Sequence, residues 1–194
     1  MLKQSCFVMA LTFMFAGNPT AMAGDGGGGA GHGKTVRIRD TVNGLCVTVG
    51  DRTNSTAPVT METCRNNDPD QKWKLDREGG PNTFRFISKS THLCLTDPGG
   101  SSSPNATACS NSLNQRFIIT LFLSNFTFQL FNRGSNECLE VGGAGNTNLQ
   151  SNPCDDESDQ KWRLELLKSK HPRVLDDSVL GIEEFGDAVD DTDE

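Results

Sequence analysis

Cysteine is the residue type whose number and spacing say most about chemistry in this chain. Six cysteines follow the apolar N-terminal segment: Cys46, Cys64, Cys94, Cys109, Cys138 and Cys154. An even number in an exported chain indicates disulfide bonds, although the count alone leaves the pairing open. No two of these cysteines have the CxxC spacing of a zinc knuckle, so we expect no metal site and no cofactor.

Residue types that carry out catalysis do not form a recognisable set. The histidines are His32 in a glycine-rich stretch, His92 in a predicted turn and His171 beside a proline. None of them stands in a nucleophile–base arrangement. We therefore expect a binding protein and not an enzyme.

The cysteines belong to a unit that occurs three times. A Gln-x-aromatic triplet follows each cysteine pair, at residues 71–73, 115–117 and 160–162. The second cysteines are 45 and 45 residues apart, and the glutamines are 44 and 45 residues apart. Self-similarity at one period indicates repeated structural units.

Short segments in which apolar and polar residues alternate must position the cysteines and the Gln-x-aromatic triplets. They recur at equivalent places in each unit: 36–38, 45–49, 73–75, 83–87, 93–97, 117–122, 126–130, 137–141 and 162–166. Gly, Pro, Asn and Asp separate them, which is typical of an all-β domain with about four short strands per unit. Alternation also predicts that Val47, Leu95 and Leu139 face the core. It predicts that Thr48, Thr96 and Glu140, each two residues after a first cysteine, face outward.

The threefold order of Cys-Leu-x-Val, second cysteine and Gln-x-Trp resembles the ricin B-type lectin family, whose fold is the β-trefoil. The resemblance covers residues 35–170 and gives repeats at about 35–81, 82–125 and 126–170, with about twelve strands in all. It implies one disulfide in each repeat: Cys46–Cys64, Cys94–Cys109 and Cys138–Cys154. It also implies a structural role for the triplets, namely Gln71 and Trp73, Gln115 and Phe117, and Gln160 and Trp162.

In that family each repeat can hold a sugar in a shallow pocket. An acid, an amide-bearing side chain and an Asn before Gln-x-Trp bind hydroxyl groups, and an aromatic ring covers the C–H face of the sugar. The third repeat matches best, with Glu140, Gln150, Asn152 and Asp159 as its candidate residues. The second repeat keeps Asn114, and its Asp97 lies one residue late, so it would serve only if a bulge turned it outward.

None of the three pockets has an aromatic residue at the stacking position, so we expect degenerate sugar sites. The expected function is a secreted carbohydrate-binding module for glycans or glycoproteins, with its best pocket in the third repeat. The alternative is a trefoil scaffold for protein–protein interaction that has lost sugar binding. No basic stripe indicates a nucleic-acid partner.

The flanking segments have different compositions. Residues 1–23 have the charge, short apolar run and Ala-x-Ala site of a signal peptide, which predicts secretion with no membrane span after cleavage; an uncleaved anchor is the alternative. Residues 24–34 form a predicted Gly-rich linker. Residues 171–194 form an acidic tail, predicted to be disordered, whose apolar spacing could also suit a protein partner.

Three Asn-x-Ser/Thr sequons, at Asn54, Asn105 and Asn125, are expected sites of N-glycosylation if the host adds such glycans.

Overall fold

The computed structural model describes residues 33–51, 55–100, 102–142, 145, 147–167 and 173–174. The predicted signal peptide, most of the glycine-rich linker, the sequon asparagine Asn54 and nearly all of the acidic tail lie outside these residues. Predictions about those segments therefore remain predictions.

Alternating sequences form twelve short strands that follow the three repeats, four strands in each. The first repeat contains β1 (Thr35–Asp40), β2 (Leu45–Val49), β3 (Thr56–Thr63) and β4 (Trp73–Arg77). The second contains β5 (Thr83–Ser88), β6 (Cys94–Thr96), β7 (Asn105–Thr107) and β8 (Phe117–Phe122). The third contains β9 (Thr127–Asn132), β10 (Cys138–Val141), β11 (Leu149–Asn152) and β12 (Trp162–Leu166).

Four shorter elements complete the described chain. A 3₁₀ turn ends at the glutamine of each triplet: η1 (Pro69–Gln71), η2 (Leu113–Gln115) and η3 (Ser158–Gln160). A two-residue strand, β13 (Arg173–Val174), pairs with β12 beyond the third repeat.

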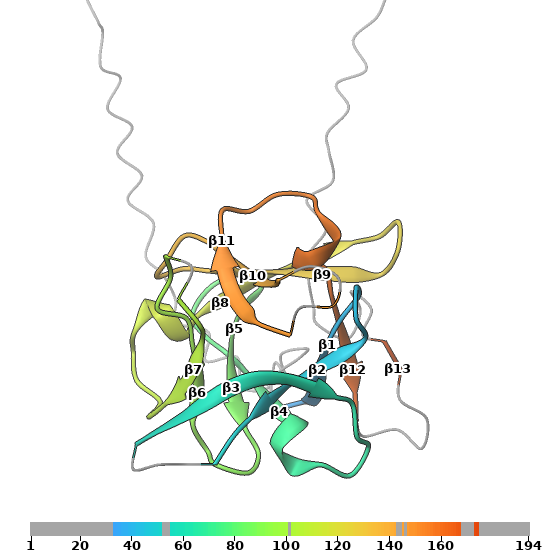
Figure 1. Ribbon diagram of the computed structural model, residues 1–194. Coiled ribbons are helices and arrows are strands. Elements are labelled where there is room, and N and C mark those ends of the chain that lie inside the picture. Colours follow the sequence, from blue (N-terminus) through green and yellow to red (C-terminus); the bar gives the residue numbers. More distant parts are fainter. Residues whose placement is uncertain are drawn as a thin grey trace, which may run out of the picture.

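Six strands close into a ring, because β1 pairs with β4, β4 with β5, β5 with β8, β8 with β9, β9 with β12, and β12 with β1. The remaining strands form one hairpin per repeat: β2–β3, β6–β7 and β10–β11. Figure 1 shows these hairpins at separate places around the molecule. A ring of six strands with three hairpins is the β-trefoil, so the predicted fold is confirmed.

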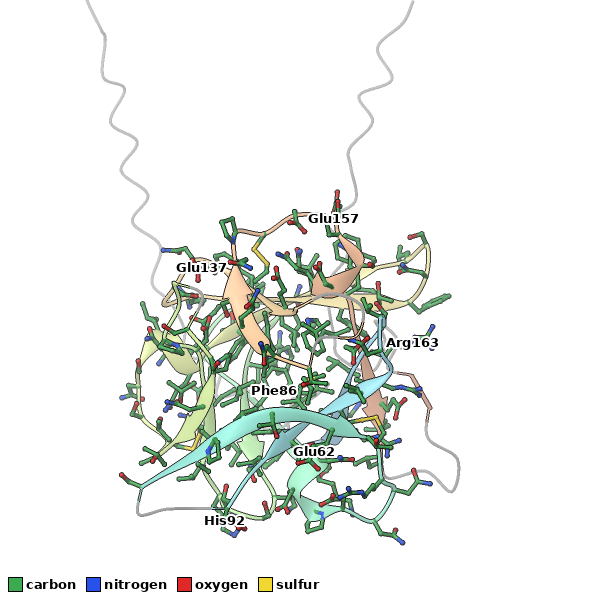
Figure 2. All side chains as sticks on the ribbon, viewed as in Figure 1. Glu62, Phe86, His92, Glu137, Glu157 and Arg163 are labelled. Atoms are coloured by element: carbon green, nitrogen blue, oxygen red, sulfur yellow. A yellow bond between two sulfur atoms is a disulfide. The ribbon has the colours of Figure 1, made fainter. Side chains whose placement is uncertain are left out.

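The triplet aromatics begin the fourth strand of each repeat and anchor the core. Trp73, Phe117 and Trp162 have no exposed surface, and the Phe117 ring packs edge-on against Phe86, with ring centroids 5.6 Å apart. Figure 2 shows Phe86 in the interior of the molecule. The tryptophan Nε1 atoms donate to backbone carbonyl oxygens on β2 and β10, at 3.0 and 2.9 Å. Phenylalanine has no such donor, so the second repeat lacks this bond.

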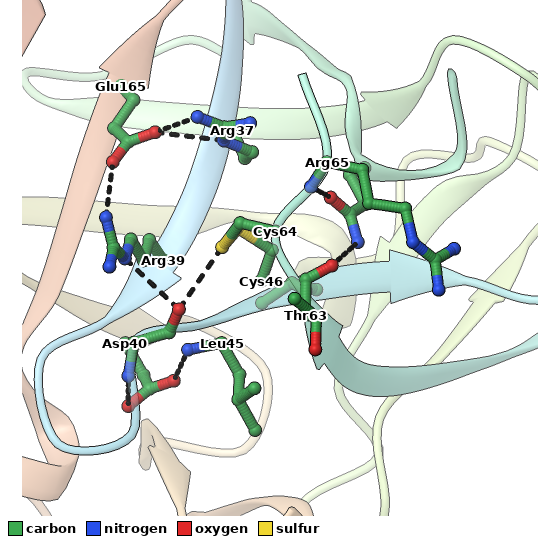
Figure 3. Close-up of a disulfide and its surroundings, with 12 residues drawn as sticks. Arg37, Arg39, Asp40, Leu45, Cys46, Thr63, Cys64, Arg65 and Glu165 are labelled. Atoms are coloured by element: carbon green, nitrogen blue, oxygen red, sulfur yellow. Dashed lines mark hydrogen bonds and ion pairs between the residues drawn. A yellow bond between two sulfur atoms is a disulfide. The ribbon is translucent and has the colours of Figure 1, made fainter. Parts of the chain in front are cut away.

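The glutamine of each triplet binds the backbone on both sides of the second cysteine. Its Nε2 donates to the carbonyl oxygen just before that cysteine, on Thr63, Ala108 and Pro153, at 2.9–3.0 Å. Its Oε1 accepts from the N–H just after that cysteine, on Arg65, Ser110 and Asp155, at 2.7–3.0 Å. Figure 3 shows Thr63 and Arg65 on either side of Cys64. These bonds satisfy partly buried backbone groups on both sides of the disulfide.

The disulfides join the residues that the family resemblance implied: Cys46–Cys64, Cys94–Cys109 and Cys138–Cys154. Each closes a loop of 15 to 18 residues within one repeat. Closing a loop of this size stabilises a fold by about 3 kcal/mol in the chain-entropy model.

One prediction about side-chain direction is wrong. Thr48 and Glu140 are buried, with 4% and 8% of their surface exposed, and Thr96 is half-buried. They do not face solvent, because the 3₁₀ turn places the triplet glutamine over that face of the hairpin. Each of them accepts a hydrogen bond from the glutamine Nε2, at 3.1 to 3.2 Å.

A second repeated device caps the turn between the first two strands of each unit. The residue six positions before the first cysteine is buried, and its side chain accepts from backbone N–H groups of the turn: Asp40, Ser88 and Asn132. The residue two positions before the cysteine has a left-handed backbone: Gly44 (φ 70°), His92 (φ 59°) and Asn136 (φ 59°). Glycine, histidine and asparagine tolerate this region better than most residues. The fixed spacing of six residues before each first cysteine is the sequence signal for this cap.

Candidate functional site

The third repeat brings its four predicted sugar-binding residues together. Glu140 on β10 lies directly opposite Gln150 on β11, and Cys138 lies opposite Asn152. Because side chains alternate along a strand, these positions share one face of the hairpin. Asp159 joins them from η3, next to the buried Gln160.

The Glu140 carboxylate is the centre of this group. Its Oε1 accepts from Gln150 Nε2 at 2.7 Å and from Asn152 Nδ2 at 2.6 Å, while its Oε2 accepts from Gln160 Nε2 at 3.2 Å. A buried carboxylate with three amide donors is well satisfied. Its role in this arrangement is to orient Gln150 and Asn152, which are only half-buried.

Asp159 contributes a buried hydrogen-bond acceptor to this group. Its Oδ1 is buried and has no hydrogen-bond partner among the described residues. Burial raises the pKa of the Asp159 carboxyl above its ordinary value, and the negative charge of Glu140 raises it further. A buried acceptor without a donor is energetically costly, and a ligand hydroxyl group would supply that donor.

Asp159→Asn is expected to stabilise the protein at neutral pH. A raised pKa favours the protonated acid, so its stabilising effect is complete below the ordinary pKa of 3.8 and is lost as the pH rises through the higher folded-state value. Asparagine is neutral throughout, so the variant should show a small rise in Tm at about pH 7 and none at about pH 3.

Asp70→Asn is the matched control for this change. Asp70 holds the same position in the first repeat, where the hydroxyl of Thr48 stands in place of the Glu140 carboxylate. Calorimetry across the pH range should show the gain only for the third-repeat variant. An equal gain in both variants, or a gain that persists at low pH, would contradict the explanation.

The second repeat does not bring its weaker candidates into such a group. Asp97 is fully buried, and it accepts from Ser135 Oγ at 2.7 Å and from the Gly99 N–H at 3.0 Å. It therefore joins β6 to the turn after β9 instead of turning outward on a bulge. Asn114 is half-buried, and a Cβ atom on Gly134 would lie 1.8 Å from its Oδ1, so the asparagine packs closely against that glycine.

Threonines replace the carboxylate in the other two hairpins. In the second repeat Gln115 Nε2 donates to the hydroxyls of Thr96 and Thr107, which also bond to each other at 2.8 Å. In the first repeat Gln71 donates to Thr48, which lies opposite Thr60. Only the third hairpin of the described structure places an acid at this position.

Comparison with known proteins agrees with this fold. Residues 31–117 match the family described as the ricin-type beta-trefoil lectin domain, which confirms the resemblance seen in the repeats. The matched range ends at Phe117, so the third-repeat group lies beyond it. A search of curated proteins gives no significant match.

Solved structures of low sequence identity share the architecture. The designed 3-fold symmetric protein ThreeFoil is 19% identical, with a TM-score of 0.59 over 67% of this chain and 96% of that one. A Polyporus squamosus lectin, solved with a human-type influenza-binding epitope, is 12% identical, with a TM-score of 0.59 over 70% of this chain and 50% of that one. The hemolytic lectin CEL-III is 21% identical, with a TM-score of 0.54 over 68% of this chain and 30% of that one.

The fold defines the class of this domain as a β-trefoil. Residues 31–117 of it are similar to the ricin-type beta-trefoil lectin domain. The chain spans half or less of the two natural lectins, so their ligands and activities are properties of longer proteins. Within the described residues, no helix has the length and apolar character needed to cross a membrane.

Proposed function

We propose that the protein is a secreted, non-enzymatic glycan-binding module whose working sugar site is the hairpin of the third repeat. The observation that carries the proposal is the unpartnered Asp159 Oδ1 beside the Glu140–Gln150–Asn152 group. Three disulfides support export, because such bonds persist in oxidising compartments.

In this proposal the four residues of the third-repeat group have different roles. Asp159 Oδ1 accepts a hydrogen bond from a sugar hydroxyl group. Gln150 contributes the carbonyl oxygen that its bond to Glu140 does not use. Glu140 holds the amides in place and makes no direct contact with sugar. Binding through so few polar groups is expected to be weak, because Asn152 stands where the family has a stacking ring.

Gln150→Ala tests the site most directly. Loss of one hydrogen bond and of the amide that shapes the pocket should weaken glycan binding by about 10-fold, which corresponds to about 1.4 kcal/mol. The mature domain is first screened on a glycan array in multivalent form, and the affinity for the best glycan is then measured by titration. Glu140→Ala should abolish binding, with an unfolding curve recorded to confirm that the variant is folded.

Thr60→Ala is the matched control, since Thr60 has the same register in the first hairpin as Gln150 has in the third. It should leave binding unchanged. A folded domain that binds nothing on the array would end the lectin proposal. Equal losses in the two variants would mean that the third hairpin is not the site.

A further inference from the structure

The tip of the β8–β9 hairpin exposes two large apolar side chains. Leu123 and Phe126 are 54% and 55% exposed, and they lie in the four-residue turn between Phe122 and Thr127. Phe126 also has a left-handed backbone, with φ of 51°. A contiguous exposed apolar patch marks a surface that another group can cover.

The same tip contains the sequon Asn125-Phe126-Thr127. Asn125 is exposed, and its Oδ1 accepts from the Thr127 hydroxyl at 2.6 Å and from the Thr127 N–H at 3.3 Å. These bonds span two residues, so the turn that presents the asparagine needs no contact from elsewhere in the fold. Thr127 is buried at the start of β9, which fixes the base of the turn.

The sequon at Asn105 has the opposite surroundings. Asn105 lies on β7, which pairs with β3 on one side and with β6 on the other. Its Oδ1 is buried, and the hydroxyl of its threonine, Thr107, is held by Gln115 and Thr96. Asn105 is half-buried within a strand that is paired on both sides, so it is less accessible than the exposed Asn125.

We propose that Asn125 is N-glycosylated, and that the attached sugar covers Leu123 and Phe126, while Asn105 remains unmodified in the folded protein. The proposal rests on the export proposed above. The Nδ2 atom of Asn125 forms a bond to the anomeric carbon of an oligosaccharide carried on a lipid diphosphate. The bond from that carbon to the phosphate oxygen breaks, the lipid diphosphate leaves, and Nδ2 loses one proton to solvent.

The first sugar of such a glycan has the right chemistry for this tip. A pyranose presents C–H groups on one face and hydroxyls at its edges, so it can rest on the Phe126 ring while its hydroxyls stay in water. The sugar that covers the Phe126 ring is therefore attached to the neighbouring residue of the same chain.

The test is expression of the full chain in eukaryotic secretory cells, with peptide mass mapping of both the cells and the medium. The expected result is a glycan on Asn125 that peptide N-glycosidase removes, with Asn105 unmodified. Asn125→Gln and Thr127→Val should each abolish the corresponding mass shift, whereas Thr127→Ser and Asn105→Gln should retain it. Because valine has the shape of threonine, Thr127→Val keeps the hairpin if the glutamine variant fails to fold.

A second readout measures the covering role. Enzymatically deglycosylated protein should bind an apolar dye at least twofold more strongly than the glycosylated form, and Phe126→Ser should remove that increase. Absence of a glycan on Asn125 in both fractions, or equal occupancy of Asn105, would overturn the proposal. Failure of export is distinguished because the chain would then be missing from the medium, and glycan-array binding is scored separately on the mature domain.

Discussion

Glu165→Ala is expected to lower the free energy of unfolding by about 3–5 kcal/mol, the cost of removing one partner from a buried ion pair. Glu165 on β12 lies opposite Arg37 on β1 and accepts from its guanidinium at 2.9 and 2.5 Å. The two side chains are only 11% and 7% exposed. Arg39 adds a longer contact at 3.4 Å, and Figure 3 shows both arginines directed at Glu165. The variant would leave the Arg37 charge buried without its counter-charge.

Two further variants make this expectation specific, with stability read from urea unfolding curves. The double variant Arg37→Met, Glu165→Leu removes both charges and should recover most of the loss, because well-packed apolar residues often replace a buried ion pair at little cost. Glu157→Ala, at an exposed glutamate of the same repeat, should change stability by less than about 0.5 kcal/mol. A loss below about 1 kcal/mol for Glu165→Ala would show that water reaches the pair and screens it.

Gln160→Leu is expected to cost about 2–4 kcal/mol, since it removes the hydrogen-bond partner of one buried and two partly buried groups while keeping the side chain's approximate volume. Gln160 has no exposed surface. Its removal leaves the Pro153 carbonyl and the Asp155 N–H without their partner, and it takes one of the three donors from Glu140. Hydrogen bonds to charged groups contribute more than neutral ones, so the bond to Glu140 should account for a large share.

Gln71→Leu is the matched comparison, because Gln71 makes the same two backbone bonds but donates to the neutral hydroxyl of Thr48. We expect a smaller loss there, measured by the same unfolding assay. A double-mutant cycle with Glu140→Thr should show coupling of about 0.5–3 kcal/mol between positions 140 and 160, as for other residues in direct contact. Equal losses of stability at the two glutamines, with no coupling, would mean that the hydrogen bond from Gln160 to Glu140 does not stabilise the fold.

Several features of the fold were predictable from local spacing. Three cysteine pairs and three Gln-x-aromatic triplets at one period define the repeats, and each triplet acts on a cysteine only a few residues before it. Alternation placed Val47, Leu95 and Leu139 in the core, where all three have no exposed surface. These properties depend on residues that are close in the chain, so the sequence displays them directly.

The surroundings of the candidate site were less predictable from the sequence. Alternation alone assigned Glu140 to the outer face of its strand, but it could not show that η3 would fold Gln160 over that face and bury the carboxylate. The sequence places Asp97 near a sugar pocket, yet its hydrogen-bond partner Ser135 is 38 residues away, in the turn of the next repeat. Neither contact has a spacing signal, because each depends on how one segment packs on another.

The sequence by itself therefore determined the repeat, the all-β architecture and the resemblance that implied the disulfide pairing. Tertiary structure alone decided which polar groups are satisfied and which are left open. It paired Arg37 with Glu165 across 128 residues, and it left Asp159 with an unused acceptor beside a fully bonded Glu140. The physical reason is that the type of a side chain sets how many hydrogen bonds it can make. Which groups fill those bonds depends on how the ring of strands and the three hairpins pack together.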